Sequence, residues 1–372
     1  MYRLFFLLGL FFSLSLTACD DTETCSDCNI NNMNNSTNNN TSTNNSSNNA
    51  INNQTNNTTN NTTNNMTNNT TNNTTNNTTS GVYVSDSDIW NEGELTVTVE
   101  SFTAEVTGSP VDFTLYVPSD GGIYPTVIFQ HGFLLDATWF SGILTHIASH
   151  GFAVVAPQMY SADSNPLGKP NAAEEAITAG EFRDWIVENL QDITSCDVST
   201  ELLGIAGHSR GGKVTWLLLS DCPDCAQAVA GIDPVDGTGG PLGGEERVVD
   251  GPFDFDFPSL VIGAELSTES VNMFSSACAP EGDNHVQFYE ASASVAFHVL
   301  ALEYGHLDML DDLESCTICS TCVSGEGDHS LMRKFVAGEL VGFFRGSLSG
   351  DESSWENLST EDAPISFEYE DK

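Results

Sequence analysis

The segment 201–220 constrains the fold of this chain more than any other. An apolar run over 201–206 predicts a buried strand, residues 207–211 read Gly-His-Ser-Arg-Gly, and 213–220 predicts a helix. A G-x-S-x-G motif between a strand and a helix predicts a nucleophile elbow, a strained turn that holds the serine hydroxyl at the carboxyl end of the strand. We therefore expect Ser209 to be a nucleophile; the alternative is a structural glycine turn that happens to contain a serine.

The N-terminus predicts export. Residues 1–18 have the pattern of a signal peptide, with Arg3 followed by an apolar run over 4–16 that is too short to span a bilayer. Cys19 follows Leu-Thr-Ala, which resembles a bacterial lipobox. In this interpretation Cys19 becomes the N-terminus, carries lipid and anchors the protein in the cell envelope. Cleavage of an ordinary signal peptide near Ala18 is the alternative.

Composition divides the rest of the chain into three parts. Residues 29–80 are almost entirely Asn, Thr and Ser, which cannot bury an apolar face, so we interpret 19–80 as a disordered tether. Residues 81–350 have the length of one large α/β domain. The acidic residues 351–372 are expected to form a loose tail.

The charge restricts the partners. The formal net charge is −42, with only 10 Lys and Arg, which argues against nucleic acid because phosphate binding requires a basic surface. An anionic bilayer would also repel this surface, so membrane association is expected through lipid on Cys19.

Strand-like apolar runs alternate with helical periodicity through the folded part. The expected strands are 96–102, 111–117, 125–130, 152–156, 201–206, 226–232, 259–263 and 296–302, and the expected helices are 138–150, 172–190, 213–220 and 331–344. The first two strands should form an antiparallel pair. The continuous apolar character of the others predicts an α/β fold with a mainly parallel sheet covered by helices on both faces.

Catalytic groups in such sheets lie at the carboxyl ends of strands. Asp233 is the first polar residue after the strand 226–232, where a carboxylate could orient an imidazole and stabilise its protonated form. Asp236 could serve instead, or could be a turn residue. Glu265, after the next strand, is the main alternative acid.

His306 follows the last expected strand in a glycine-containing turn, and the order serine, aspartate, histidine is that of the α/β hydrolases. A capping or core histidine is the alternative. The side chain of His208 is expected to point away, His131 is expected to be structural, and we assign no role to His285 or His298.

Backbone donors for an oxyanion can also be placed. The N–H of Arg210 begins the helix after the elbow, and Gly132 allows the early loop to turn the N–H of Phe133 inward. Nearby apolar side chains would form a rim that favours a hydrophobic substrate: Phe133, Leu134, Trp139 and Phe140. Trp139 and Phe140 could equally be ordinary core residues.

The ten cysteines allow two interpretations. The spacings Cys222-x-x-Cys225 and Cys316-x-x-Cys319-x-x-Cys322 are compatible with zinc. Disulfides in surface loops are favoured, because export places the chain where disulfides persist and no histidine spacing matches. Apart from Cys19 nine cysteines remain, so one thiol is left over or pairs outside the chain.

Several segments resemble one known family. They are 129–133, 146–160, 207–213, 232–237, 278–285, 304–312 and 332–338, in the same order over most of 100–348. They are similar to chlorophyllases, serine esterases of the α/β-hydrolase fold that split the phytyl ester of chlorophyll. The resemblance implies Ser209 as nucleophile, His306 as base and Asp233 as acid.

These observations predict a lipid-anchored serine carboxylesterase for a hydrophobic ester, without a metal or organic cofactor. The lipobox, the tether and the acidity depart from the plant pattern and leave the ester open: pigment, lipid or polyester. A non-catalytic cell-surface binding protein on a hydrolase scaffold is the alternative, and a zinc protein built on the cysteine pairs is a third hypothesis.

Overall fold

The computed structural model describes residues 82–119, 121–161, 169–237, 247–293, 295–311, 316 and 318–372. The expected signal peptide, Cys19 and the tether over 19–80 lie outside these residues. None of the helices in the described part of the chain combines the length and apolar character needed to cross a bilayer.

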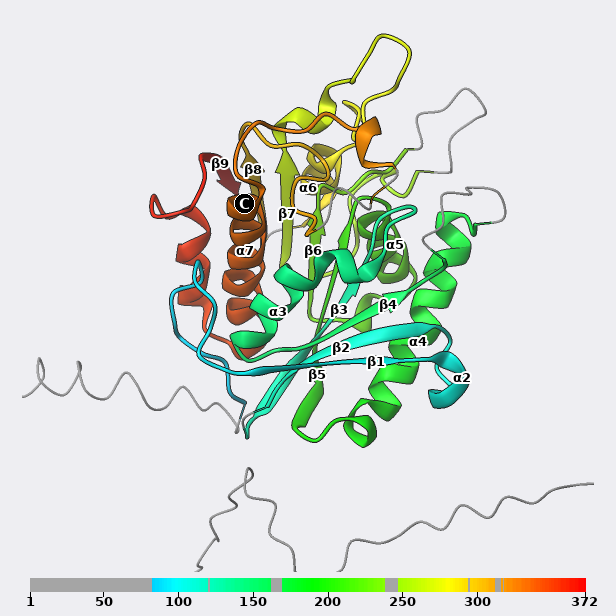
Figure 1. Ribbon diagram of the computed structural model, residues 1–372, viewed down its shortest axis with the longest axis vertical. Helices are drawn as coiled ribbons and strands as arrows, with labels where there is room; N and C mark the ends of the chain where they lie inside the picture. Colours follow the sequence, from blue (N-terminus) through cyan, green and yellow to red (C-terminus); the bar gives the residue numbers. More distant parts are fainter. Residues whose placement is uncertain are drawn as a thin grey trace, which may run out of the picture. The chain divides into compact units, whose positions relative to one another are not determined.

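A single sheet organises the described residues, with the strand order β1-β2-β4-β3-β5-β6-β7-β8-β9 (Figure 1). The strands are β1 Val97–Phe102, β2 Asp112–Pro118, β3 Ile123–Gln130, β4 Ala153–Gln158, β5 Asp197–His208, β6 Ala228–Ile232, β7 Ser259–Ala264, β8 Ala296–Ala301 and β9 Phe367–Asp371. Pairs among β3 to β8 are parallel, whereas β1–β2, β2–β4 and β8–β9 are antiparallel. The predicted antiparallel pair and mainly parallel sheet are therefore confirmed.

Helices cover both faces of the sheet. They are α2 Ala104–Thr107, α3 Ser141–Ser149, α4 Ala172–Ile193, α5 Arg210–Asp221, α6 His285–Ala291 and α7 His329–Ser349, with 3-10 helices η1 Ala137–Phe140, η2 Pro223–Cys225, η3 Glu265–Thr268, η4 Cys319–Thr321 and η5 Glu352–Ser359. One apolar cluster includes α3 and α7, and another on the opposite face includes α4, α5 and α6. This is the α/β-hydrolase architecture that the sequence predicted.

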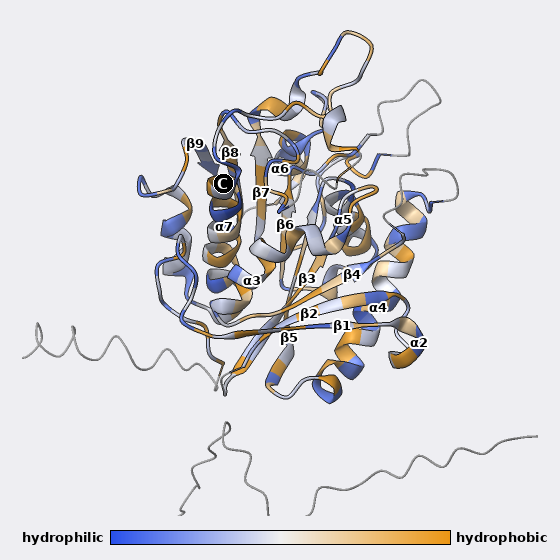
Figure 2. Ribbon diagram, viewed as in Figure 1, coloured by the Kyte–Doolittle hydropathy of each residue, from blue (hydrophilic) through white to orange (hydrophobic). Residues whose placement is uncertain are grey.

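Side-chain alternation explains why the strands are apolar throughout. Along β3, Val127 and Phe129 pack in the α3/α7 cluster, while Ile128 packs in the α4/α5 cluster. A strand covered on both faces needs apolar residues at every position. On α4 only one side is buried, including Phe182 and Ile186, and Figure 2 shows hydrophilic and hydrophobic residues alternating along this helix.

The C-terminal residues differ from the expectation. Residues 351–372 were predicted to form a loose tail, yet they contain η5 and β9, and β9 pairs antiparallel with β8. Alternation in this acidic segment places Phe367 on the core side, where its ring centroid lies 5.4 Å from that of Phe335. The prediction was wrong because the high acid content obscured a short alternating strand.

Glu339 gives a prediction about stability. It lies on α7 with no exposed area, and its carboxylate oxygens have no hydrogen-bond partner among the described residues. Burial raises the pKa of this carboxyl well above the ordinary value of 4.5. Between about pH 4.5 and this raised pKa, the folded protein therefore keeps a proton on Glu339 that the unfolded chain has lost. The resulting stability is complete below about pH 4.5 and is lost as the pH rises through the folded-state pKa.

Relative to a Glu339→Gln variant, the native chain should lose about 1.4 kcal/mol of unfolding free energy per pH unit within that window. Denaturant unfolding of both proteins at pH values from about 4 to 8 measures the difference. Parallel stability curves across this range would contradict the assignment of a buried, protonated Glu339.

Candidate active site

The turn between β5 and α5 is strained as an elbow requires. Ser209 has φ 55° and ψ −121°, a region that residues with a side chain rarely adopt. A Cβ on Gly207 would lie 2.4 Å from the carbonyl carbon of Gly211, and one on Gly211 would lie 2.4 Å from the backbone oxygen of Gln130. Only glycine fits at both positions, so the motif is explained by the close approach of three backbone segments.

Three distant side chains meet at the carboxyl ends of the strands. The Ser209 hydroxyl donates to Nε2 of His306 at 2.9 Å, and the other ring nitrogen, Nδ1, donates to Oδ2 of Asp233 at 2.6 Å. The backbone fixes this alignment, because the N–H of Ser209 donates to Ile232 O and its carbonyl accepts from Val235 N. The elbow is thereby bonded on both sides to the segment that carries Asp233.

The surroundings of Asp233 keep it charged. The side chain is fully buried, and Oδ1 accepts from the Ser267 hydroxyl at 3.3 Å and from the Ala264 N–H at 3.4 Å. Burial by itself raises the pKa of Asp233, but the hydrogen bond and charge of His306 outweigh it, and the pKa lies below its ordinary value. An ionised Asp233 can therefore hold His306 in one tautomer.

The alternative acids are engaged elsewhere. Glu265 is exposed at the start of η3, and its Oε2 accepts from the N–H of Glu303 at 2.7 Å. Asp236 is buried and accepts from the N–H of Val248 at 2.7 Å, as expected for a residue that organises a turn. Of the three carboxylates considered from the sequence, the structure brings Asp233 to His306.

His208 lies closer to the site than the sequence suggested. Its side chain was expected to point away, but its ring centroid lies 4.7 Å from that of His306, and Nε2 donates to the His306 carbonyl at 2.9 Å. Burial, assisted by the charge of His306, lowers the pKa of His208 to about 3. This neutral ring therefore holds the backbone of His306 in place through its hydrogen bond. No local sequence signal indicated this orientation of the His208 side chain.

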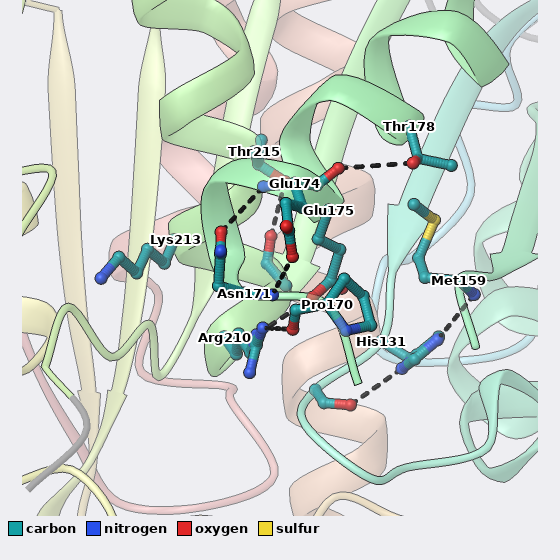
Figure 3. Close-up of polar contacts among 12 residues, drawn as sticks. His131, Met159, Pro170, Asn171, Glu174, Glu175, Thr178, Arg210, Lys213 and Thr215 are labelled. Carbon is teal, nitrogen blue, oxygen red and sulfur yellow. Dashed lines mark hydrogen bonds and ion pairs between the residues drawn. The ribbon is translucent and has the colours of Figure 1, made fainter. Parts of the chain in front are cut away.

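His131 has the structural role that was predicted. Its Nδ1 donates to the carbonyl of Gly132 at 2.8 Å, and Nε2 accepts from the N–H of Met159 at 3.0 Å (Figure 3). Burial lowers the pKa of His131 to about 4. The neutral ring fixes a loop in which Leu134 has φ 58° and which carries Phe133 past the elbow.

The side chain of Arg210 joins three segments around the elbow. Its Nε lies 3.0 Å from Oε2 of the buried Glu175, and Nη2 donates to the Pro170 carbonyl (Figure 3). The guanidinium carbon lies 4.8 Å from the ring centroid of Phe133, as in a cation–π contact. Because Asn171 caps the start of α4, this contact set is anchored to a fixed helix end.

A cavity of about 360 Å³ opens beside Ser209. Its apolar lining includes Phe133, Leu135, Val235, Ala277, Pro280, Leu307 and Ile318. The predicted rim is therefore partly wrong: Phe133 lines the cavity, but Leu134 is buried and Phe140 packs in the core against Phe129. Trp139 packs against the same core cluster, as the alternative interpretation held.

Six of the seven cysteines in the described residues form disulfides, as predicted. The bonds are Cys222–Cys225, Cys278–Cys322 and Cys316–Cys319. Cys278 and Cys322 both line the cavity, so their bond joins two of its walls. The buried Cys196 thiol donates to the Pro118 carbonyl at 3.0 Å. Cys25 and Cys28 lie outside the described residues, and within those residues no cluster of His, Cys, Asp and Glu could hold a metal ion.

Comparisons with known proteins match the folded part of the chain to chlorophyllases. The family model for chlorophyllases matches residues 85–371. Chlorophyllase-2 of Arabidopsis thaliana is 33% identical over 277 residues, which is 70% of this chain and 85% of that protein. Chlorophyllase-1 of Citrus unshiu is 33% identical over 289 residues, covering 74% and 85%. Cutinase est1 of Thermobifida alba is 28% identical over 156 residues, covering 42% and 46%. This chain belongs to the chlorophyllase family.

Proposed function

We propose that this protein is a serine carboxylesterase that hydrolyses a hydrophobic carboxylic ester through an acyl-enzyme. The observation that carries the proposal is the hydrogen-bonded series Ser209–His306–Asp233, whose serine and histidine line a mainly apolar cavity. A nucleophile, a base and an orienting carboxylate within hydrogen-bond reach of one another are the arrangement that ester hydrolysis requires.

The reaction proceeds in two halves. Ser209 Oγ attacks the ester carbonyl while His306 Nε2 takes its proton, and the N–H groups of Phe133 and Arg210 stabilise the resulting oxyanion. His306 returns the proton to the departing alcohol, which leaves an acyl ester on Ser209. Water then attacks this ester while His306 takes its proton, and His306 returns the proton to Ser209 Oγ as the carboxylic acid is released. Asp233 stabilises the imidazolium in both halves.

The cavity and the relatives support a hydrophobic substrate. Most of the surface of the cavity wall is apolar, although Arg210, Lys213 and Asp236 also line it, and the relatives compared are named chlorophyllases and cutinases. We propose the phytyl ester of chlorophyll as the first candidate, with lipid or polyester as the other hydrophobic esters in view.

A substrate panel tests the proposal. The purified protein is assayed on short p-nitrophenyl esters, long-chain esters and chlorophyll, and we expect turnover of esters with release of chlorophyllide from chlorophyll. Turnover of long-chain esters without chlorophyllide would reject chlorophyll and retain the esterase. If none of the esters is cleaved, a cell-surface binding protein on a hydrolase scaffold is favoured instead.

For location, we propose that the mature protein is exported and lipid-anchored through Cys19, which follows the lipobox-like Leu-Thr-Ala. Metabolic labelling with a radioactive fatty acid in a bacterial host should mark the protein. Labelling that persists in a Cys19→Ala variant would contradict this anchor.

A further inference from the structure

The loop between η3 and α6 exposes apolar side chains beside the candidate active site. Met273 is 87% exposed and Phe274 is 92% exposed, and the nearby Val271 is 46% exposed. Among the large apolar side chains in the described ranges, only Val106 on α2 is comparably exposed, at 84%. In Figure 1 the yellow loop projects at the top of the molecule, while α2 lies at its lower edge.

The loop holds this exposed turn in place. The N–H of Phe274 donates to the Asn272 side chain at 2.9 Å, and Ser275 donates to the Asn272 carbonyl through its N–H and its hydroxyl. At the base of the loop, Ser270 forms an isolated antiparallel bridge with Cys322, to which Cys278 is disulfide-bonded. The turn is therefore built to project Met273 and Phe274 into solvent.

The same loop continues into the cavity wall. Ser276, Ala277 and Cys278 line the cavity that contains Ser209, two to five residues after the exposed pair. The exposed turn thus adjoins, along the chain, a wall of the cavity that contains Ser209. An apolar patch next to a substrate cavity places the enzyme and a poorly soluble substrate on the same surface.

Charge identifies the kind of surface. In a chain of net charge −42, residues 270–280 contain no charged side chain. Approach of residues 270–280 to a neutral lipid surface therefore brings no charged side chain of this stretch into the apolar phase, since the charged residues of the loop, Glu269, Glu281 and Asp283, flank it. An anionic surface would be repelled by the remainder of the molecule.

We infer that the turn Met273–Phe274 docks the enzyme onto a neutral lipid surface and positions the cavity mouth at that surface. The inference rests on the proposed function for its use, since docking would deliver a lipid-dissolved ester to Ser209. The binding itself does not require catalysis, so it can be measured separately.

Binding is measured first, on the full chain carrying Cys19→Ala, which cannot be acylated there, and Ser209→Ala, which prevents turnover. Sedimentation with phosphatidylcholine vesicles compares this protein with the same protein carrying Met273→Ser and Phe274→Ser. We expect at least a tenfold loss of vesicle affinity. Val106→Ser, which removes a similarly exposed side chain from α2, is the matched control and should not change the affinity.

Activity is measured second, in the full chain with Cys19→Ala and an intact Ser209. The Met273→Ser/Phe274→Ser variant should keep its rate on a water-soluble p-nitrophenyl ester, and its rate on a long-chain ester held in phosphatidylcholine vesicles should fall at least tenfold.

Equal vesicle affinity with and without the two substitutions would overturn the inference. A shift from dimer to monomer in vesicle-free solution, with vesicle affinity unchanged, would make a second copy of the chain the occupant instead. If the protein with intact Ser209 hydrolyses no ester, yet its vesicle binding still depends on Met273 and Phe274, the proposed function is rejected and the docking surface is retained.

Discussion

Replacing Ser209 with alanine should lower ester turnover by about five orders of magnitude or more and abolish labelling by a serine-directed fluorophosphonate. The hydroxyl oxygen that donates to His306 at 2.9 Å is the atom that would form both the acyl ester and the phosphonate adduct. Removal of this oxygen leaves only the oxyanion donors and the binding cavity to assist attack by water. The loss should therefore appear in kcat.

The alanine variant should fold normally. Alanine keeps a Cβ at a position whose φ is 55°, so the backbone strain of the elbow is the same in both proteins. Thermal unfolding should confirm this. Ser276→Ala, which alters another serine of the same cavity, is the matched control and should retain fluorophosphonate labelling. Labelling that persists in the Ser209 variant would reject Ser209 as the nucleophile.

The elbow could be predicted from the sequence because its determinants are local. Five consecutive residues encode a turn in which Gly207 and Gly211 are required by contacts with adjoining segments. The continuous apolar runs likewise predicted strands that are covered on both faces, such as β3. Fold class follows from such patterns, since each depends on the burial of one segment at a time.

The rim of the cavity could not be predicted in the same way. Phe133 and Phe140 are both aromatic and close in sequence, but Phe133 lines the cavity whereas Phe140 packs against Phe129 in the core. Their different surroundings depend on how η1 and α3 dock on the sheet. The 44-residue separation of Cys278 and Cys322 posed the same problem, because only the folded loops bring the two cysteines together.

The choice between Asp233 and Glu265 shows the limit most clearly. Each follows a parallel strand, β6 or β7, and each therefore lies at the edge of the sheet where catalytic residues gather. Chain order places both between Ser209 and His306. The distinction arises from the backbone bonds that join the elbow to the segment after β6, a contact between distant parts of the chain.

Asp233→Asn should lower kcat by about four orders of magnitude, whereas Glu265→Gln should change it less than about threefold. An amide at position 233 can donate to His306 Nδ1, which favours the tautomer with its proton on Nε2 and blocks acceptance of the Ser209 proton. Glu265 binds the backbone of Glu303, away from this relay. Steady-state kinetics on one soluble ester, with thermal unfolding of both variants as a folding control, separates the roles. If the Glu265 change alone disables the enzyme, the carboxylate that stabilises His306 during turnover is not the one bonded to it here, and the loop after β7 must move for catalysis.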